Sequence, residues 1–217
     1  MTRTLLLDLD GTLVDTLPDL TASLNRVMTA RGLAPFPQKD VAGFVGDGVA
    51  RLVERAFRAR GHEPDAEAEA AYVADYTAHL MEGSRPYPGV PEALRDLAAE
   101  GWQFAVCTNK PEQAARKLLK GVGLAPLIAA IGGGDSFPVR KPDPAHLLAT
   151  LRAAGGSTEQ AVMTGDNRND VVAAGGAGVP CIFAAWGYGR PEMAEGAAAI
   201  AQNAQEMAAI ARRLLPG

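Results

Sequence analysis

The sequence predicts an α/β protein, a doubly wound parallel sheet with an inserted all-helical segment. Two observations lead to this fold class. From residue 88 onward, short apolar runs alternate with amphipathic stretches of helical period, as expected for a chain of strand, helix and strand units. Residues 15–87 carry helical periodicity alone. Parallel strands joined by right-handed crossovers form a sheet with helices on both faces, and ligands bind beyond the carboxyl ends of its strands.

The composition is that of an ordinary globular protein and limits the functions to consider. With 217 residues, 47% hydrophobic and 21% charged, the chain suits one domain or one domain with a small insert. A net charge of −4 argues against nucleic acid as a partner, since nucleic-acid-binding surfaces are basic. No apolar run approaches the roughly 18 residues of a membrane span, and Met1–Leu7 is too short for a secretory signal. We therefore expect no membrane partner and a cytoplasmic location.

The first expected strand, Leu5–Leu7, leads directly into two carboxylates. Alternation along an extended chain sends Asp8 and Asp10 to the same side, and such a pair is costly unless a divalent cation binds it or one carboxyl stays protonated. Gly11 allows a sharp turn, and Thr12 offers a hydroxyl and a backbone N–H to phosphate oxygens. The pattern indicates a phosphate and metal site. The alternative is an ordinary Asp-Gly turn with two solvated aspartates.

The next stretch predicts an all-helical domain over residues 15–87, inserted into a domain formed by 1–14 and 88–217. Between Val14 and Pro88 we expect no strand. A breaker-rich segment, 84–89, marks the return to the first domain. Four arginines in the insert are interpreted as a solvated helix face: Arg51, Arg55, Arg58 and Arg60. The expected helices run from Leu17 to a stop at Gly32, from Val49 to near Gly61, and from about Asp65 to Glu82.

The remaining chain predicts four more strands, each followed by a helix. Asp143 can cap a helix that has Pro144 in its first turn, and Asn203 with Glu206 fits a capping box. Two cysteines in separate apolar segments predict buried reduced thiols, Cys107 and Cys181. The expected strands are 104–107, 127–131, 161–164 and 181–184. The expected helices are 90–100, a segment ending near 122, 144–154, a short segment from about 169, and a segment beginning at 203.

Polar side chains follow these strands at the ends where a parallel sheet binds its ligands. Thr108 and Asn109 come after the second strand, and Lys141 stands on the long loop after the third. Asp166 and Asp170 come after the fourth. We expect these side chains to gather with the first two aspartates at one edge of the sheet.

With these four clusters in their order, the sequence resembles the haloacid dehalogenase superfamily of phosphotransferases. The motifs are the Asp8–Thr12 segment, Thr108, Lys141 before Pro142, and the segment Gly165–Asp170. The resemblance implies a Rossmann-like sheet with a helical cap domain, the inserted segment. Finer features resemble the phosphoglycolate phosphatases of that superfamily: residues 43–49, 86–90, 108–111 and 133–136.

The resemblance implies a mechanism centred on two carboxylates and a magnesium ion. Asp8 is the expected nucleophile, which attacks phosphorus and becomes an aspartyl-phosphate. Asp10 is the expected general acid and base. Mg²⁺ is the expected cofactor, held by Asp8, the backbone carbonyl of Asp10, and Asp166. Asp170 is expected either to orient water or Lys141 from the second shell, or only to stabilise the first turn of its helix.

Further residues are expected to bind the substrate. Thr108 and the backbone N–H of Asn109 face the phosphate oxygens, and Lys141 neutralises them. In the insert, the backbone N–H groups near Gly46 and Gly48 are expected to meet a substrate carboxylate, with Arg51 or Lys110 assisting, although both glycines also suit plain turns. Asp47 is expected to point away from an acidic substrate.

The function expected from the resemblance is Mg²⁺-dependent hydrolysis of a small phosphorylated substrate, most simply 2-phosphoglycolate, by a monomer or homodimer. Related alternatives are a sugar phosphomutase, a pyrophosphatase or other small-molecule phosphatase, and a phosphonatase-like hydrolase that would use Lys39 as a Schiff-base nucleophile. An alternative of another class is a catalytically inactive partner-binding module. Hydrolysis of a simple phosphomonoester without a bisphosphate activator would distinguish the phosphatase hypothesis from the phosphomutase.

Overall fold

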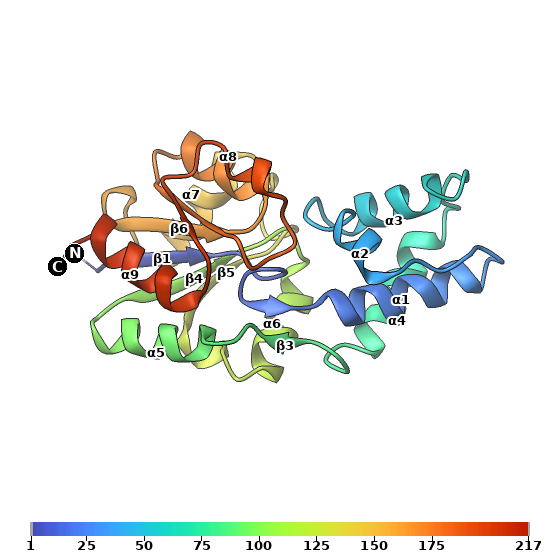
Figure 1. Ribbon diagram of the computed structural model, residues 1–217, viewed down its shortest axis with the longest axis horizontal. Helices are drawn as coiled ribbons and strands as arrows, with labels where there is room; N and C mark the ends of the chain where they lie inside the picture. The colour runs from blue at the N-terminus through green and yellow to red at the C-terminus, as the bar shows by residue number, and fades with distance from the viewer. Residues whose placement is uncertain (1, 217) are drawn as a thin grey trace.

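The computed structural model describes residues 2–216 and has two regions, which Figure 1 shows end to end along the long axis. The sheet region, residues 2–15 and 85–216, is a parallel sheet flanked by helices. The helical insert, residues 16–84, is the segment between strands β2 and β3. The predicted fold class is confirmed. The domain boundaries 1–14, 15–87 and 88–217 stay a prediction, and positions 1 and 217 lie outside the described residues.

The sheet places the first strand at its centre. Within residues 2–216 it has six strands, in the order β5-β4-β1-β6-β7-β8, and every adjacent pair is parallel. Leu5 of β1 lies opposite Phe104 on one side and Val162 on the other. The strands are β1 (Thr4–Leu7), β4 (Gln103–Cys107), β5 (Ile128–Gly132), β6 (Ala161–Gly165), β7 (Cys181–Ala184) and β8 (Ala199–Ala201).

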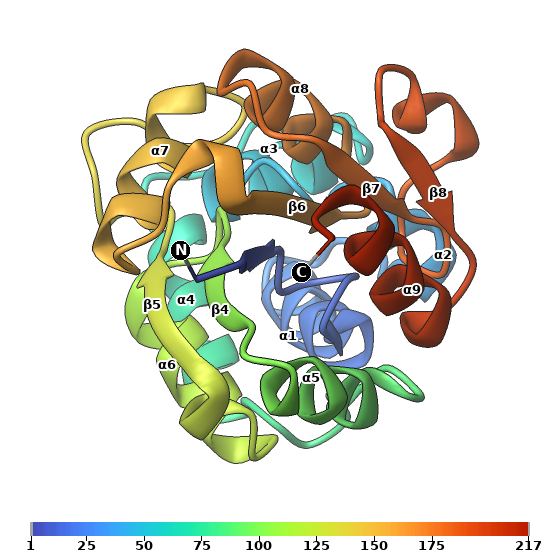
Figure 2. The ribbon, with the colours of Figure 1, turned by 90° about the vertical axis from the view of Figure 1, so that its left-hand side faces the viewer.

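Helices cover both faces of the sheet, which explains why β1 is apolar throughout (Figure 2). Leu5 and Leu7 pack into the core under α5, α6 and α9, whereas Leu6 packs into the core under α7 and α8. Alternate side chains of one strand therefore stabilise opposite layers. The helices are α5 (Val90–Ala99), α6 (Glu112–Gly121), α7 (Pro144–Ala153), α8 (Arg168–Gly176) and α9 (Ala204–Leu214). Short 3₁₀ turns span Ala125–Leu127, Thr158–Gln160 and Pro191–Ala194.

The helical insert has its own hydrophobic core. The apolar stripes expected from the sequence meet there, with Leu24 and Tyr72 fully buried. Its helices are α1 (Leu17–Thr29), α2 (Gln38–Ala42), α3 (Val49–Arg58) and α4 (Ala68–Ala78). The insert therefore packs around side chains distinct from those of the sheet.

Four short elements were not expected. β2 (Val14–Asp15) and β3 (Arg85–Pro86) pair antiparallel where the chain enters and leaves the insert, so the expectation of no strand between Val14 and Pro88 is wrong. Two-residue strands carry no alternation that a sequence pattern could reveal. The five-residue helix α2 and the alanine-rich edge strand β8 escaped prediction for the same reason.

Two predicted helix caps form, one of them in altered form. Asp143 accepts a hydrogen bond from the N–H of Ala145 at 2.9 Å. Asn203 accepts from the N–H of Glu206 at 2.9 Å, but the Glu206 carboxylate accepts from the N–H of Gln202, one residue before the expected partner.

Two predictions from composition can be compared with the structure. Both cysteine thiols are buried and free in the described part of the chain, and burial raises the pKa of Cys107 to about 12. Among residues 2–216, none of the helices has the length and apolar character needed to cross a membrane.

Candidate active site

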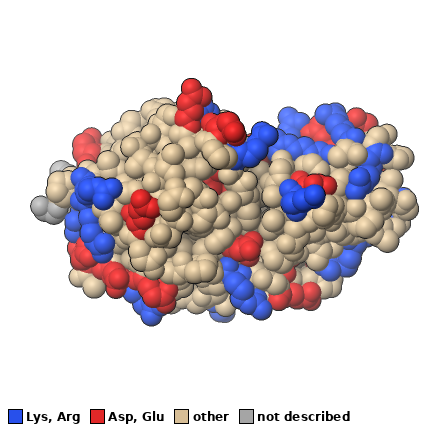
Figure 3. Space-filling model, in the orientation of Figure 1, with Lys and Arg blue, Asp and Glu red and all other residues tan. Residues whose placement is uncertain are grey.

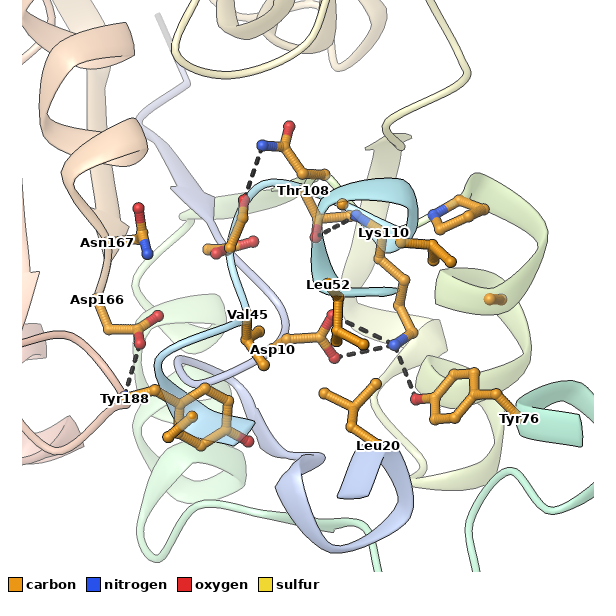
Figure 4. A pocket seen from close by; sticks show the side chains of 18 of the residues that line it. Asp10, Leu20, Val45, Leu52, Tyr76, Thr108, Lys110, Asp166, Asn167 and Tyr188 are labelled. Carbon is orange, nitrogen blue, oxygen red and sulfur yellow. Dashed lines mark hydrogen bonds and ion pairs between the residues drawn. The ribbon is translucent and has the colours of Figure 1, made fainter. Parts of the chain in front are cut away.

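A cavity of about 660 Å³ lies between the carboxyl edge of the sheet and the helical insert. The loops after β1, β4 and β6 form one wall, and residues of α1, α3 and α4 form the opposite wall. Figure 4 shows that side chains from both regions point into it. Seven of the residues predicted from the sequence line this cavity: Asp8, Asp10, Gly46, Gly48, Thr108, Asn109 and Asp166.

Asp8 stands at the end of the central strand. Its N–H donates to the Thr164 carbonyl at 2.9 Å, which continues the pairing of β1 with β6. Its Oδ1 accepts from the N–H of Leu9 at 2.7 Å and lies 2.9 Å from Lys141 Nζ. A backbone donor and a cation therefore fix this carboxylate at the cavity wall.

Lys141 reaches this strand from the loop before α7 and is buried between two carboxylates. Its ammonium donates to Asp170 Oδ1 at 2.6 Å, in addition to its contact with Asp8. Burial opposes the charged form, but Asp170 and Asp8 outweigh it, and the pKa of Lys141 is raised. Asp170 also accepts from the N–H of Asn167 at 3.0 Å and completes a capping box at the start of α8. Asp170 therefore contacts both Lys141 and the first turn of α8, the two alternatives that the sequence left open.

Asp166 is fixed by donors from two distant loops. Its Oδ1 accepts from the Thr12 hydroxyl at 3.0 Å, and its Oδ2 accepts from the N–H groups of Tyr188 and Gly189 at 2.7 and 3.2 Å. A Cβ at Gly187 or Gly189 would overlap Asp166, so only glycine lets this loop close over the carboxylate.

Three carboxylates converge here, and their chemistry fits a divalent cation. Oxygens of Asp8, Asp166 and Asp170 lie within 4.8 Å of one another. Burial raises the pKa of Asp166 to about 8, and the charges of Asp8 and Asp170 add to the rise. Since Lys141 pairs with Asp8 and Asp170 but makes no contact with Asp166 in the described part of the chain, a doubly charged cation with a preference for oxygen ligands would balance the group.

Asp10 lines the same cavity but takes different partners. Lys110 Nζ lies 3.0 Å from its Oδ1 and 3.2 Å from its Oδ2, and the Thr16 hydroxyl donates to Oδ1 at 2.7 Å. Lys110 also donates to the Tyr76 hydroxyl of α4 at 2.8 Å (Figure 4). Asp10 and Lys110 thus link the sheet region to the insert.

Thr108 and Asn109 start the loop that follows β4. The N–H of Thr108 donates to the Gly132 carbonyl at 2.9 Å, which holds the loop against β5. The Asn109 amide donates to the carbonyls of Gly46 and Lys141, both at 2.9 Å. Asn109 therefore connects the loop that carries Lys141 to the helical insert.

Gly11 and Thr12 turn their polar groups toward the protein rather than the cavity. Gly11 has a φ of 83°, and a Cβ there would overlap the Asp166 carboxylate. The Thr12 hydroxyl donates to Asp166, and its N–H donates to the Leu9 carbonyl at 3.3 Å. In this structure both donors of Thr12 hold the loop and Asp166, and the phosphate contacts expected from Thr12 stay a prediction.

The glycine loop of the insert rests on the sheet region. The Gly46 carbonyl accepts from the side-chain amides of Asn109 and Asn169, and a Cβ at Gly46 would overlap Asn167. Asp47 pairs with Arg55 and accepts from the Asn169 amide at 2.7 Å. Asp47 is not among the residues that line the cavity, in agreement with the expectation that it points away.

The insert arginines lie outside this cavity. In Figure 3, Lys and Arg side chains gather over the helical insert, with acidic side chains among them. Arg51 and Arg58 both pair with Glu54, at 2.5 and 2.7 Å, and more than half of each arginine side chain is exposed. The sequence interpretation of a solvated face agrees with these contacts, and Arg51 is not among the residues that line the cavity.

Several residues of the site were missed in the sequence. Tyr188 donates its N–H to Asp166, and its hydroxyl accepts from the N–H groups of Thr16 and Leu17 at the start of α1. Its position between Gly187 and Gly189, shortly after the strand β7, is the signal that could have identified it. The partnership of Lys110 with Tyr76 had no such signal, because it joins two segments far apart in the sequence.

Comparisons with known proteins agree with this site. Residues 2–178 match the haloacid dehalogenase-like hydrolases. The chain is 45% identical over 192 residues to a phosphoglycolate phosphatase of Agrobacterium fabrum, which covers 87% of this chain and 82% of the relative. It is 44% identical over 202 residues to the phosphoglycolate phosphatase of Rhodospirillum rubrum, covering 89% and 84%.

A solved structure shares the whole architecture. The crystal structure described as a predicted phosphoglycolate phosphatase from Haemophilus somnus superimposes with a TM-score of 0.89 at 30% identity, covering 96% of this chain and 97% of the other. The family match spans most of the sequence, and both regions of the fold are shared. The chain therefore belongs to the haloacid dehalogenase-like hydrolases.

Proposed function

We propose that the protein hydrolyses small phosphomonoesters through an aspartyl-phosphate on Asp8, and that its substrate is 2-phosphoglycolate. The observation that carries the proposal is the pairing of Asp8 with buried Lys141 at 2.9 Å, on the wall of a cavity that Asp10, Thr108 and Asp166 also line. The names of the relatives support the choice of substrate.

In the first half-reaction Asp8 attacks phosphorus with a carboxylate oxygen. The new bond joins that oxygen to phosphorus, and the bond from phosphorus to the ester oxygen breaks. Asp10 gives its proton to the departing oxygen, so that glycolate leaves as an alcohol rather than an alkoxide. In the second half, Asp10 takes a proton from water as that water attacks phosphorus, which releases phosphate and restores Asp8.

The surrounding groups compensate the negative charge of the phosphoryl group. Lys141 keeps its ammonium beside Asp8 and reduces the repulsion between carboxylate and phosphate. Thr108 and the N–H of Asn109 are proposed to donate to phosphoryl oxygens from the loop after β4. Asp8, Asp166 and the Asp10 carbonyl would hold Mg²⁺, which supplies a Lewis acid for the phosphoryl oxygens.

We also propose that residues 15–87 act as a cap domain over this site. Gly46 and Gly48, with φ values of 120° and 87°, would bring backbone N–H groups toward the substrate, and closure would exclude water during turnover. The enzyme is proposed to act on free substrate in the cytoplasm, as a monomer or homodimer. Light scattering of the purified chain measures whether it is a monomer or a homodimer.

A panel of phosphate esters tests the proposal. The purified protein with Mg²⁺ is incubated with 2-phosphoglycolate, ethyl phosphate, sugar phosphates, nucleotides and pyrophosphate, and released phosphate is measured. We expect 2-phosphoglycolate to give the highest kcat/KM, without any bisphosphate activator. Absence of phosphate release across the panel would contradict the enzyme proposal, whereas a requirement for a bisphosphate would indicate a phosphomutase.

A further inference from the structure

We propose that Lys110, Tyr76 and Tyr72 form a binding subsite for a carboxylate that the substrate carries beyond its ester oxygen. The inference deepens the proposed function and rests on it, because it places the ester oxygen beside Asp10. The three residues line one side of the cavity, two of them from helix α4 of the insert and one from the loop after β4.

Lys110 is a buried cation with an unusual set of partners. Only 6% of the residue is exposed, and a lysine is rarely buried to that degree unless neighbouring groups compensate for the loss of its hydration. Its ammonium contacts both oxygens of Asp10 and the Tyr76 hydroxyl. The loop after β4 thus places a positive charge directly beside the proposed proton donor.

The two tyrosines add hydrogen-bond donors beside this charge. The Tyr76 hydroxyl accepts from Lys110, which leaves its own proton for another acceptor. Tyr72 stacks on Tyr76 with ring centroids 6.0 Å apart, and the residue is fully buried. Within residues 2–216 the Tyr72 hydroxyl has no hydrogen-bond partner, although it belongs to a residue that lines the cavity. A buried unpaired hydroxyl is costly, so a bound polar group is expected to satisfy it.

The location of this cluster matches the shape of a short acid. In the proposed reaction the ester oxygen lies next to Asp10, so the group attached to that oxygen extends toward Lys110. Leu20 and Leu52 line the cavity on the same side, and Figure 4 shows them near Asp10 and Tyr76. A carboxylate one carbon beyond the ester oxygen would meet charge and donors there, whereas a methyl group would meet none of them.

Other cations that line the cavity do not share this position. Lys39, Lys117 and Arg190 are all exposed to solvent, so their charges are screened and cost little to leave unpaired. Lys117 lies on α6, which follows the loop that carries Lys110, and provides a matched control for the loss of one positive charge.

Calorimetric binding to a variant that cannot turn over tests the subsite. Asp8→Asn protein with Mg²⁺ is titrated with 2-phosphoglycolate and with ethyl phosphate, which has a methyl group in place of the carboxylate. We expect Asp8→Asn to prefer 2-phosphoglycolate. Adding Lys110→Met should weaken the binding of 2-phosphoglycolate by about 10- to 100-fold and the binding of ethyl phosphate by less than about threefold.

The hydroxyl variants sharpen the test, because they keep the pair of Lys110 with Asp10. Tyr76→Phe and Tyr72→Phe should each weaken the binding of 2-phosphoglycolate by about 3- to 10-fold and leave the binding of ethyl phosphate unchanged. Lys117→Met should change the affinity for neither ligand. Equal losses for the two ligands, or no loss in the tyrosine variants, would overturn the subsite. A loss of 2-phosphoglycolate binding in Lys117→Met as large as that in Lys110→Met would also overturn it.

Failure of the subsite can be told apart from failure of the proposed function. If the wild-type protein hydrolyses 2-phosphoglycolate but the variants lose both ligands equally, the subsite is wrong and the phosphatase remains. If the wild-type protein hydrolyses no ester, the catalytic proposal is wrong, while the binding preference of Asp8→Asn still decides the subsite.

Discussion

The sheet region and the helical insert contribute different chemistry to one cavity. The sheet region supplies charged groups that hold one another in place, such as Lys141 between Asp8 and Asp170. The insert supplies apolar walls and hydroxyl donors, with Tyr76 and Tyr72 among them. Bond breaking is therefore expected to depend on the sheet region, and choice of substrate on the insert together with Lys110 from the loop after β4. The same fold can then change its substrate through the insert without disturbing the reacting groups.

The largest expected effect comes from the sheet region. Asp8→Asn removes the nucleophile, and kcat should fall by at least about 10⁴-fold, since loss of a covalent nucleophile has effects of this order. The near-isosteric change should leave the circular dichroism spectrum unchanged. Asp96→Asn, at an exposed position on α5, serves as the control for the loss of one carboxylate. An active Asp8→Asn protein would contradict nucleophilic catalysis by this residue.

Removal of divalent cations should have the next largest effect. Chelation should abolish phosphate release, and Mg²⁺ should restore it, because the oxygens of Asp8, Asp166 and Asp170 converge while the ammonium of Lys141 pairs with only two of these carboxylates. Mg²⁺ at about a hundred times its Kd should also stabilise the folded protein by about 2.7 kcal/mol, measured as a rise in Tm. Asp166→Asn should lose this stabilisation, whereas Asp96→Asn should keep it. Full activity after chelation would be incompatible with the cation site.

The separate cores of the two regions lead to a third prediction. Leu24 is fully buried in the insert, and Leu118 of α6 is fully buried against the sheet. Leu24→Ala should cost about 2–5 kcal/mol, and hydrogen exchange should accelerate most in α1–α4, because the insert can open while the sheet stays folded. Leu118→Ala should instead accelerate exchange in β1 and β4. Uniform acceleration across both regions by Leu24→Ala would show that the two unfold as one unit.

The sequence predicted regular elements well and contacts between loops poorly. The apolar run of β1 and the helical stripe of α1 are patterns within one segment, and each element formed close to its expected bounds. The gathering of Asp8 with Asp166 could be anticipated because parallel strands end at a common edge. By contrast, the contact of Tyr188 with Asp166 and the contact of Lys110 with Tyr76 depend on how loops and the insert pack, and no period in the sequence encodes that packing.

The smallest expected effect lies at the contact where the two regions meet. Asn169 of α8 donates its amide to the Gly46 carbonyl at 3.2 Å and to Asp47 at 2.7 Å. Asn169→Ala removes both bonds but touches neither Asp8 nor Asp10, so KM should rise by about 3- to 10-fold while kcat stays unchanged, as expected for one or two ordinary hydrogen bonds that hold the insert loop over the substrate. Gln113→Ala, at an exposed position along the same cavity, is the matched amide control and should leave both constants unchanged. A fall in kcat with unchanged KM would instead assign this contact to the reacting groups, and the division between a catalytic sheet region and a selective insert would fail at this point.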